Sequence, residues 1–143
     1  MKEKKMAKTG NFNHPSTNTT TVTGVTSTFA VARVHKHTLL PTDPLSSAQF
    51  VNAINGIYVR VNTIGGGGTS LTCKGTFDAA GDDVWFPDTE GTFATGVTTP
   101  TKGAAVFEFR LPVHIEVGSD VYLFFKMGTG SCVVDKTTIT WSE

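Results

Sequence analysis

The feature that most constrains this chain is a series of short runs whose side chains suit a half-buried strand. Residues 70–77 alternate apolar and polar side chains, residues 57–61 and 104–113 are rich in β-branched and aromatic residues, and residues 132–141 close the series. A two-residue period predicts strands with one buried face. The strongly apolar run 121–127 predicts a central strand buried on both faces. Roughly seven or eight such runs, separated by turn residues, predict an all-β, antiparallel β-sandwich of jelly-roll type.

Length and charge narrow the classes of protein to consider. The 143 residues suffice for one domain with a core, and 12 basic residues balance 12 acidic ones. A nucleic-acid interface needs a basic face, so no nucleic-acid partner is expected. No apolar run is long enough to span a bilayer, and no apolar segment follows the charged start as in a signal peptide. Synthesis in the cytoplasm, with no membrane partner, is therefore expected.

Residues 1–28 differ from the remainder in having almost nothing to bury. Lysines give way to a tract of Asn and Thr. Such a segment cannot offset its ordering entropy alone, which predicts an extended N-terminal arm over 1–28 and a sandwich domain over 29–143. A partner surface would order this arm. The candidate contact residues in it are Lys4, Lys5, Asn11, Phe12, Asn13 and His14.

The local structure of some other segments is less clearly predicted. Over 45–54 apolar residues recur every three positions after Asp43-Pro44, which favours a short helix. The alternative is a hairpin turn at Asn55-Gly56. Residues 29–36 alternate as a strand, whereas residues 78–103 are expected to be rich in loops.

Trp85 and Phe86 stand out within the loop-rich segment, beside Asp88. Exposed loop aromatics stack on sugar faces or fill partner pockets, and a nearby carboxylate accepts hydroxyl hydrogen bonds. The alternative is a loop folded over the core by its own aromatics. The acidic residues at 82–90 lack the EF-hand spacing, although a calcium or glycan role for this segment stays open.

The histidines, cysteines and glycine run are expected to have structural rather than catalytic or metal-binding roles. His35 and His37 lie on one face of a strand and could bind a metal with His14 or His114, but surface or interface histidines are favoured. Cys73 and Cys132 are expected to be small buried hydrophobes, with a single bridge as the alternative. The glycines at 65–68 lack the Lys-Ser/Thr of a phosphate loop and predict a loop tip. Without a nucleophile elbow or metalloprotease motif, neither an enzyme nor a cofactor is expected.

The runs FEFRLPV (107–113), GSDVYL (118–123), GTGSC (128–132) and ITW (139–141) resemble the last strands of small jelly-roll proteins. Capsid decoration (cement) proteins of tailed bacteriophages share this pattern, and so do carbohydrate-binding modules and fibre tips. The first resemblance implies a structural protein on the capsid surface of a virion, bound to the major capsid protein. The alternative is a receptor- or carbohydrate-binding module such as a tail-fibre tip.

Oligomeric state is predicted from the apolar run 121–127 and the low charge density. A Phe-rich strand offers more apolar surface than a small sandwich readily covers, and neutral faces suit association. These features and the lattice symmetry of capsids predict a homotrimer. The alternative is a monomer whose Phe side chains are all internal.

Overall fold

The structure is a computed structural model, and it describes residues 12–93 and 103–143. Nine strands and no helix occur in this part of the chain. They are β1 (Asn13–Asn18), β2 (Val22–Val25), β3 (Val34–Thr38), β4 (Phe50–Gly65), β5 (Ser70–Thr76), β6 (Val84–Thr92), β7 (Gly103–Glu116), β8 (Asp120–Met127) and β9 (Ser131–Ser142).

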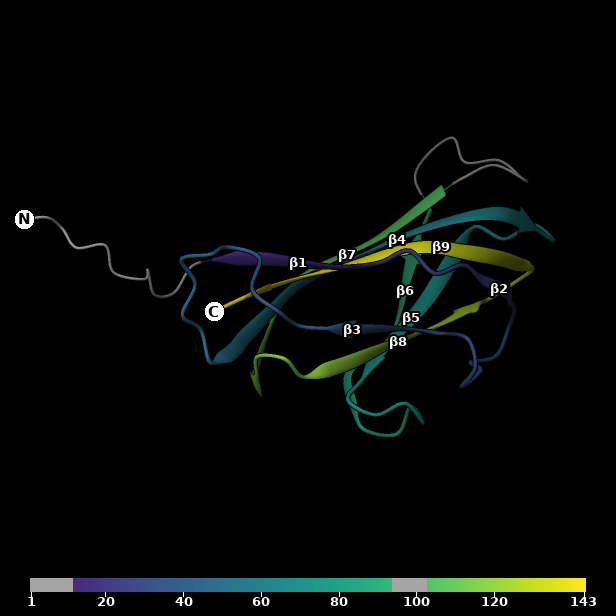
Figure 1. The fold of residues 1–143 in the computed structure, drawn as a ribbon. Coiled ribbons are helices and arrows are strands. Elements are labelled where there is room, and N and C mark those ends of the chain that lie inside the picture. The colour runs from purple at the N-terminus through teal and green to yellow at the C-terminus, as the bar shows by residue number, and fades with distance from the viewer. Residues whose placement is uncertain (1–11, 94–102) are drawn as a thin grey trace, which may run out of the picture.

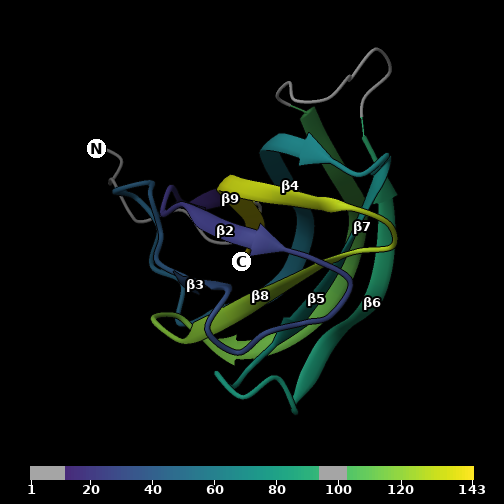
Figure 2. The ribbon, with the colours of Figure 1, turned by 90° about the vertical axis from the view of Figure 1, so that its right-hand side faces the viewer.

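The strands form two antiparallel sheets that face each other (Figures 1 and 2). One sheet has the order β1-β9-β4-β7, with β2 also paired to β9, and the other has the order β3-β8-β5-β6. The pairings are nested: β5 with β6, β4 with β7, β3 with β8, and β1 and β2 with β9. A chain folded once as a long hairpin and then wrapped across two sheets is a jelly roll. The predicted fold class is confirmed.

The core lies between the sheets and is supplied by alternate residues of the longer strands. On β8, Val121, Leu123, Phe125 and Met127 are all at most 1% exposed, as expected for a central strand. Burial of such side chains provides the main favourable term in folding. The premise that this strand offers spare apolar surface for a trimer is therefore wrong, and the trimer itself stays a prediction.

The N-terminal strands correct the predicted arm. β1 pairs with β9 from Asn13 opposite Ser142 to Asn18 opposite Thr137, and β2 continues along β9. Backbone hydrogen bonds to β9 satisfy a segment whose side chains bury little, which composition alone does not reveal. The boundary at residue 28 is wrong, because the domain includes residues 13–25. Residues 1–11 lie outside the described part of the chain.

The segment after Pro44 is also corrected. β4 begins at Phe50 and passes through Asn55 and Gly56 without a turn, with a register shift between Ile54 and Gly56. Pairing on both edges, with β7 and β9, outweighs the local helical spacing. The helix is absent from this described segment, and the alternative hairpin turn is absent from it too.

Two other expectations shift. β3 begins only at Val34 rather than at residue 29, and residues 84–92, expected in a loop, form β6. The Gly-rich segment is the turn between β4 and β5, as predicted. There Gly66 and Gly67 have positive φ values of 66° and 75°, a region open to glycine at little cost.

Candidate functional site

Two buried histidines of β3 cross the gap between the sheets and meet β9 and the N-terminal segment. We call His35, His37, Thr137, Ser16 and Thr20 the histidine seam. Both imidazoles bond to the hydroxyl of Thr137, His35 through Nδ1 at 2.7 Å and His37 through Nε2 at 2.8 Å. The other ring nitrogens reach the N-terminal segment: His35 Nε2 the Thr20 carbonyl at 2.6 Å, and His37 Nδ1 the Ser16 hydroxyl at 2.9 Å.

The partners assign the tautomers. The Thr20 carbonyl only accepts, so His35 carries its proton on Nε2, and its Nδ1 accepts from Thr137. The single Thr137 proton is then used, so Thr137 accepts from His37 Nε2, and His37 Nδ1 accepts from Ser16. The four bonds form one directional chain that is complete when both rings are neutral.

Burial lowers the pKa of both rings. His35 and His37 are 0% and 1% exposed, and the four ring bonds described above go to hydroxyl and carbonyl oxygens. Desolvation lowers the pKa of His37 to about 4, with a further contribution from His35. Desolvation also lowers the pKa of His35, partly opposed by its bond to Thr20 and by Asp135. The expectation of surface histidines is wrong.

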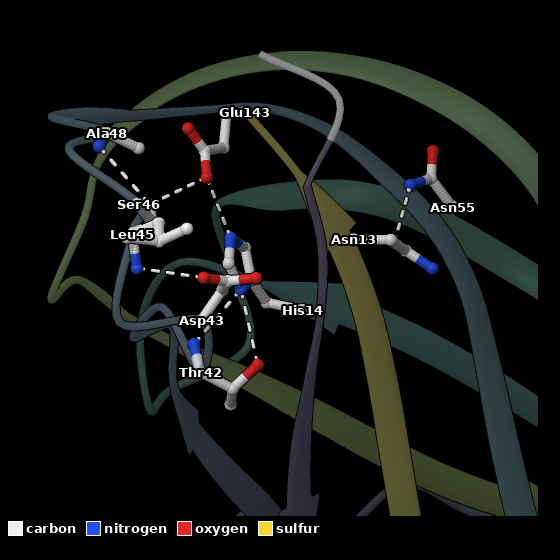
Figure 3. Close-up of polar contacts among 9 residues, drawn as sticks. All are labelled: Asn13, His14, Thr42, Asp43, Leu45, Ser46, Ala48, Asn55 and Glu143. Atoms are coloured by element: carbon white, nitrogen blue, oxygen red, sulfur yellow. Dashed lines mark hydrogen bonds and ion pairs between the residues drawn. The ribbon is translucent and has the colours of Figure 1, made fainter. Parts of the chain in front are cut away.

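A third buried histidine joins β1 to Glu143 (Figure 3). His14 Nδ1 accepts the backbone N–H of Thr42 at 3.0 Å, so Nε2 carries the proton and donates to Glu143 Oε2 at 2.9 Å. The Ser46 hydroxyl donates to the same carboxylate oxygen at 2.6 Å. The ring also lies against Trp141, with centroids 4.4 Å apart. The predicted role of His14 as an arm contact is wrong, because the side chain is fully buried.

This Ser-Glu-His grouping lacks the geometry of an acyl-transfer site. A nucleophilic serine bonds to the base, with the carboxylate on the far side of the imidazole. Here Ser46 bonds to Glu143, and the imidazole nitrogen that faces away from Glu143 accepts from a backbone amide. The grouping is structural, and it ties the loop before β4 to β1.

The two aromatics considered for an exposed contact, Trp85 and Phe86, are buried. Trp85 and Phe86 are 8% and 7% exposed, and Trp85 donates from Nε1 to the Thr76 carbonyl at 3.0 Å. A Cβ at Gly75 would lie 2.5 Å from the Trp85 ring, so the indole packs directly on the backbone of β5. The possible surface role of these two residues is therefore wrong, and the interpretation that the aromatics fold this segment over the core is confirmed. Asp88 is exposed as expected, and its carboxylate lies 3.7 Å from Lys126 Nζ.

A different aromatic occupies the outer face of the β3-β8-β5-β6 sheet. Two ammonium groups lie over the ring of half-buried Phe29, Lys74 Nζ at 4.6 Å and Lys126 Nζ at 4.7 Å from its centroid. We call Phe29, Lys74, Lys126 and Asp88 the cation–aromatic patch. Beneath it lies Phe124, which points away from the core yet is only 1% exposed because Phe29 and the β5–β6 turn cover it. The sequence did not predict this patch, because Phe29 is far in the sequence from Lys74 on β5 and Lys126 on β8.

The remaining candidate residues divide as follows. Asn13 is exposed and accepts from Asn55 at 3.0 Å, and half-buried Phe12 lies beside His14, whereas Lys4, Lys5 and Asn11 lie outside the described residues. Cys73 and Cys132 are buried and free, as the favoured interpretation predicted. Within residues 12–93 and 103–143, no three potential ligands gather as a metal site would require. No helix in the same residues is long and apolar enough to cross a membrane.

Comparison with known proteins gives only distant structural similarities. No family model matches the chain, and no curated protein matches it. The chain is similar to the capsid asymmetric unit of cyanophage Pam1, with a TM-score of 0.49 and 16% identity over 99% of this chain and 91% of that one. It is also similar to a xylan-binding module, with a TM-score of 0.42 and 12% identity over 90% of each chain. A third match is the C-terminal CBM6 of the laminarinase LamC from Zobellia galactanivorans, with a TM-score of 0.40 and 11% identity over 90% of this chain and 99% of that one. TM-scores below 0.5 carry no argument about function, so these neighbours do not discriminate between a capsid protein and a glycan-binding module.

Proposed function

We propose that this protein is a structural protein of a phage virion, which decorates the capsid by binding the major capsid protein. The observation that supports this most directly is the anchoring of β1. Strand β1 is bound along β9, and His14 within it is bonded to Glu143. A partner that binds the residues ahead of β1 would therefore hold the whole sandwich domain.

The segment ahead of β1 provides the proposed contact. Residues 1–11 contain four lysines, including Lys4 and Lys5, against the single acidic residue Glu3. This local excess of positive charge suits an acidic surface, although the whole chain is neutral. Together with exposed Asn13, these residues are the proposed capsid-binding group. A homotrimer would multiply each weak contact, because linked binding events raise the effective concentration of the next one.

Cosedimentation with empty capsids of the same phage tests the proposal. The wild-type chain should pellet with capsids, and a Lys4→Ser, Lys5→Ser variant should pellet less at moderate salt. Lys136→Ser on β9 is the matched control and should bind like the wild type. Wild-type protein that stays in the supernatant would refute the capsid role, and equal binding by the double variant would refute the role of the basic segment. Light scattering on the full chain tests the trimer.

A second candidate function, glycan binding, is supported by the cation–aromatic patch. Half-buried Phe29 supplies a partly exposed ring face, while Lys74, Lys126 and Asp88 provide donors and acceptors around it. Sugar recognition combines such a face with convergent polar groups. On a glycan array, Phe29→Ala should abolish binding, whereas Phe50→Ala should not. Phe50 is also half-buried, but it lies on β4, in the sheet that does not carry the patch. There it stacks on His114 of β7, with centroids 4.3 Å apart.

A further inference from the structure

The histidine seam joins three segments that are separate in the sequence. Ser16 belongs to β1 and Thr20 follows it, the two imidazoles belong to β3, and Thr137 belongs to β9. β1 and β3 are edge strands of opposite sheets. The seam therefore closes the sandwich along one side, where β1 and β3 come together.

Apart from the seam, few side-chain bonds connect β1 to β3 among the described residues. Asn18 Nδ2 donates to the Lys36 carbonyl at 3.0 Å, and Ser16 makes a long 3.4 Å approach to the Thr38 carbonyl. Both are exposed, so water can replace them at little cost. The imidazole bonds of the seam, like the bond of His14 to Thr42 at the start of β1, are buried, so solvent cannot replace them without opening the structure.

We propose that the seam is an acid-sensitive latch, in which protonation of His35 or His37 releases β1 and β2 from the sandwich. A proton added to His35 Nδ1 would make the Thr137 hydroxyl accept from both imidazoles, and the hydroxyl proton would lose the acceptor that it has in the neutral form. A proton added to His37 Nδ1 would turn the Ser16 hydroxyl toward the distant Thr38 carbonyl. Either change breaks the directional chain at one point.

The surroundings offer little compensation for the new charge. The N-terminal segment contributes the Ser16 hydroxyl and backbone groups of Ser16 and Thr20 that favour the charged rings, but desolvation outweighs them. β8 contributes the Phe125 ring, edge-on to His35 with centroids 5.4 Å apart. From β9, Asp135 favours a charged His35, but its carboxylate is already bonded to Arg60 at 3.0 Å. The two imidazole centroids lie 6.5 Å apart, so a charge on one ring opposes a charge on the other.

Opening the latch has a defined structural consequence. β9 pairs with β1 and β2 on one edge and with β4 on the other. Release of the N-terminal strands would leave the first edge of β9 unpaired from Cys132 to Ser142, and an unpaired edge is a template for strand addition. The pairing of β9 with β4 and the β3-β8-β5-β6 sheet would remain.

Hydrogen exchange on the full chain tests the latch. Between pH 7 and pH 4.5, protection factors corrected for intrinsic rates should fall on the order of 50-fold for β1 amides, because opened histidines bind protons that closed ones do not. Amides of β5 should keep their protection. His37→Gln should reduce the fall, and His114→Gln, a change at an exposed histidine outside the seam, should leave it unchanged. Constant β1 protection in the wild type, or an equal fall in His37→Gln, would overturn the proposal.

NMR titration of the histidine ring protons provides an independent readout if His37→Gln does not fold. In the wild type, the resonances of His35 and His37 should titrate below the ordinary histidine value of 6.5, with loss of β1 amide signals in the same pH range. Titration of both rings near pH 6.5, with β1 signals intact, would overturn the latch.

Discussion

His14 and Glu143 lie 129 positions apart in the sequence and are joined by a 2.9 Å hydrogen bond from Nε2 to Oε2. The imidazole is fully buried, and the Glu143 side chain is only 6% exposed. The bond therefore closes the nested hairpin at its outermost pair, β1 with β9. The Ser46 hydroxyl, in the loop before β4, donates a hydrogen bond to the same carboxylate.

Removing this carboxylate should destabilise the protein. In Glu143→Ala the Nε2 proton of His14 and the Ser46 hydroxyl both lose their acceptor in a buried site, with an expected loss of about 1–3 kcal/mol in the free energy of unfolding. Glu143→Gln, which keeps an oxygen acceptor, should lose less. Urea denaturation at pH 7 measures both. Equal stability of the alanine variant and the wild type would show that the bond contributes nothing.

Stability should fall as the pH is lowered from about 6.5 to about 4. The pKa of His37 is near its ordinary 6.5 when the chain is unfolded and about 4 when it is folded, so the unfolded chain binds more protons in this range. The stabilisation by neutral His37 is complete above pH 6.5 and is lost on acidification, by roughly 3 kcal/mol. The lowered pKa of His35 acts in the same direction.

Urea denaturation at several pH values measures this dependence. The profile of His37→Gln should be flatter between pH 6.5 and pH 4, while the profile of His114→Gln should follow the wild type. A wild-type midpoint that does not change over this range would contradict the assigned burial of the two rings.

Both cysteines should be unreactive in the folded protein. Burial raises the pKa of the Cys73 thiol strongly and that of Cys132 to about 12, so neither forms appreciable thiolate at pH 8. A thiol reagent such as DTNB should label neither in native buffer and both in denaturant. Rapid labelling of either native thiol would place it at the surface.

Much of the fold was predictable because strand periodicity is a local signal. The alternation over 70–77 and the apolar run 121–127 correspond to β5 and β8. The N-terminal strands and β6 were missed for a physical reason. β1 is a strand because β9 supplies hydrogen-bond partners, and no pattern within residues 13–18 shows that another segment lies beside them.

The candidate site was harder to predict because its contacts are remote in sequence. His37 and Thr137 are 100 positions apart, and a buried histidine differs from an exposed one only through such partners. Spacing placed His35 and His37 on one face correctly, but it could not show that this face is the interior. Trp85 looked like a loop residue because Gly75, which makes room for the indole, lies on another strand.

The contact between Gly75 and Trp85 gives a last prediction. A Cβ at Gly75 would lie 2.5 Å from the indole ring, closer than carbon atoms approach without displacement. Because Trp85 is 8% exposed and packs into the core, it has little room to move, and Gly75→Ala should cost about 1–3 kcal/mol. Trp85→Ala should cost about 3–5 kcal/mol through the cavity it leaves.

Gly128→Ala is the matched control, because a Cβ there meets no atom within 4 Å. Thermal unfolding should show Gly128→Ala close to the wild type and both core variants clearly lower. The comparison also separates the two roles considered for Trp85. A surface contact residue can be replaced by alanine without loss of stability, whereas a core residue cannot. Wild-type stability in Trp85→Ala would contradict the burial of the indole and favour the surface role instead.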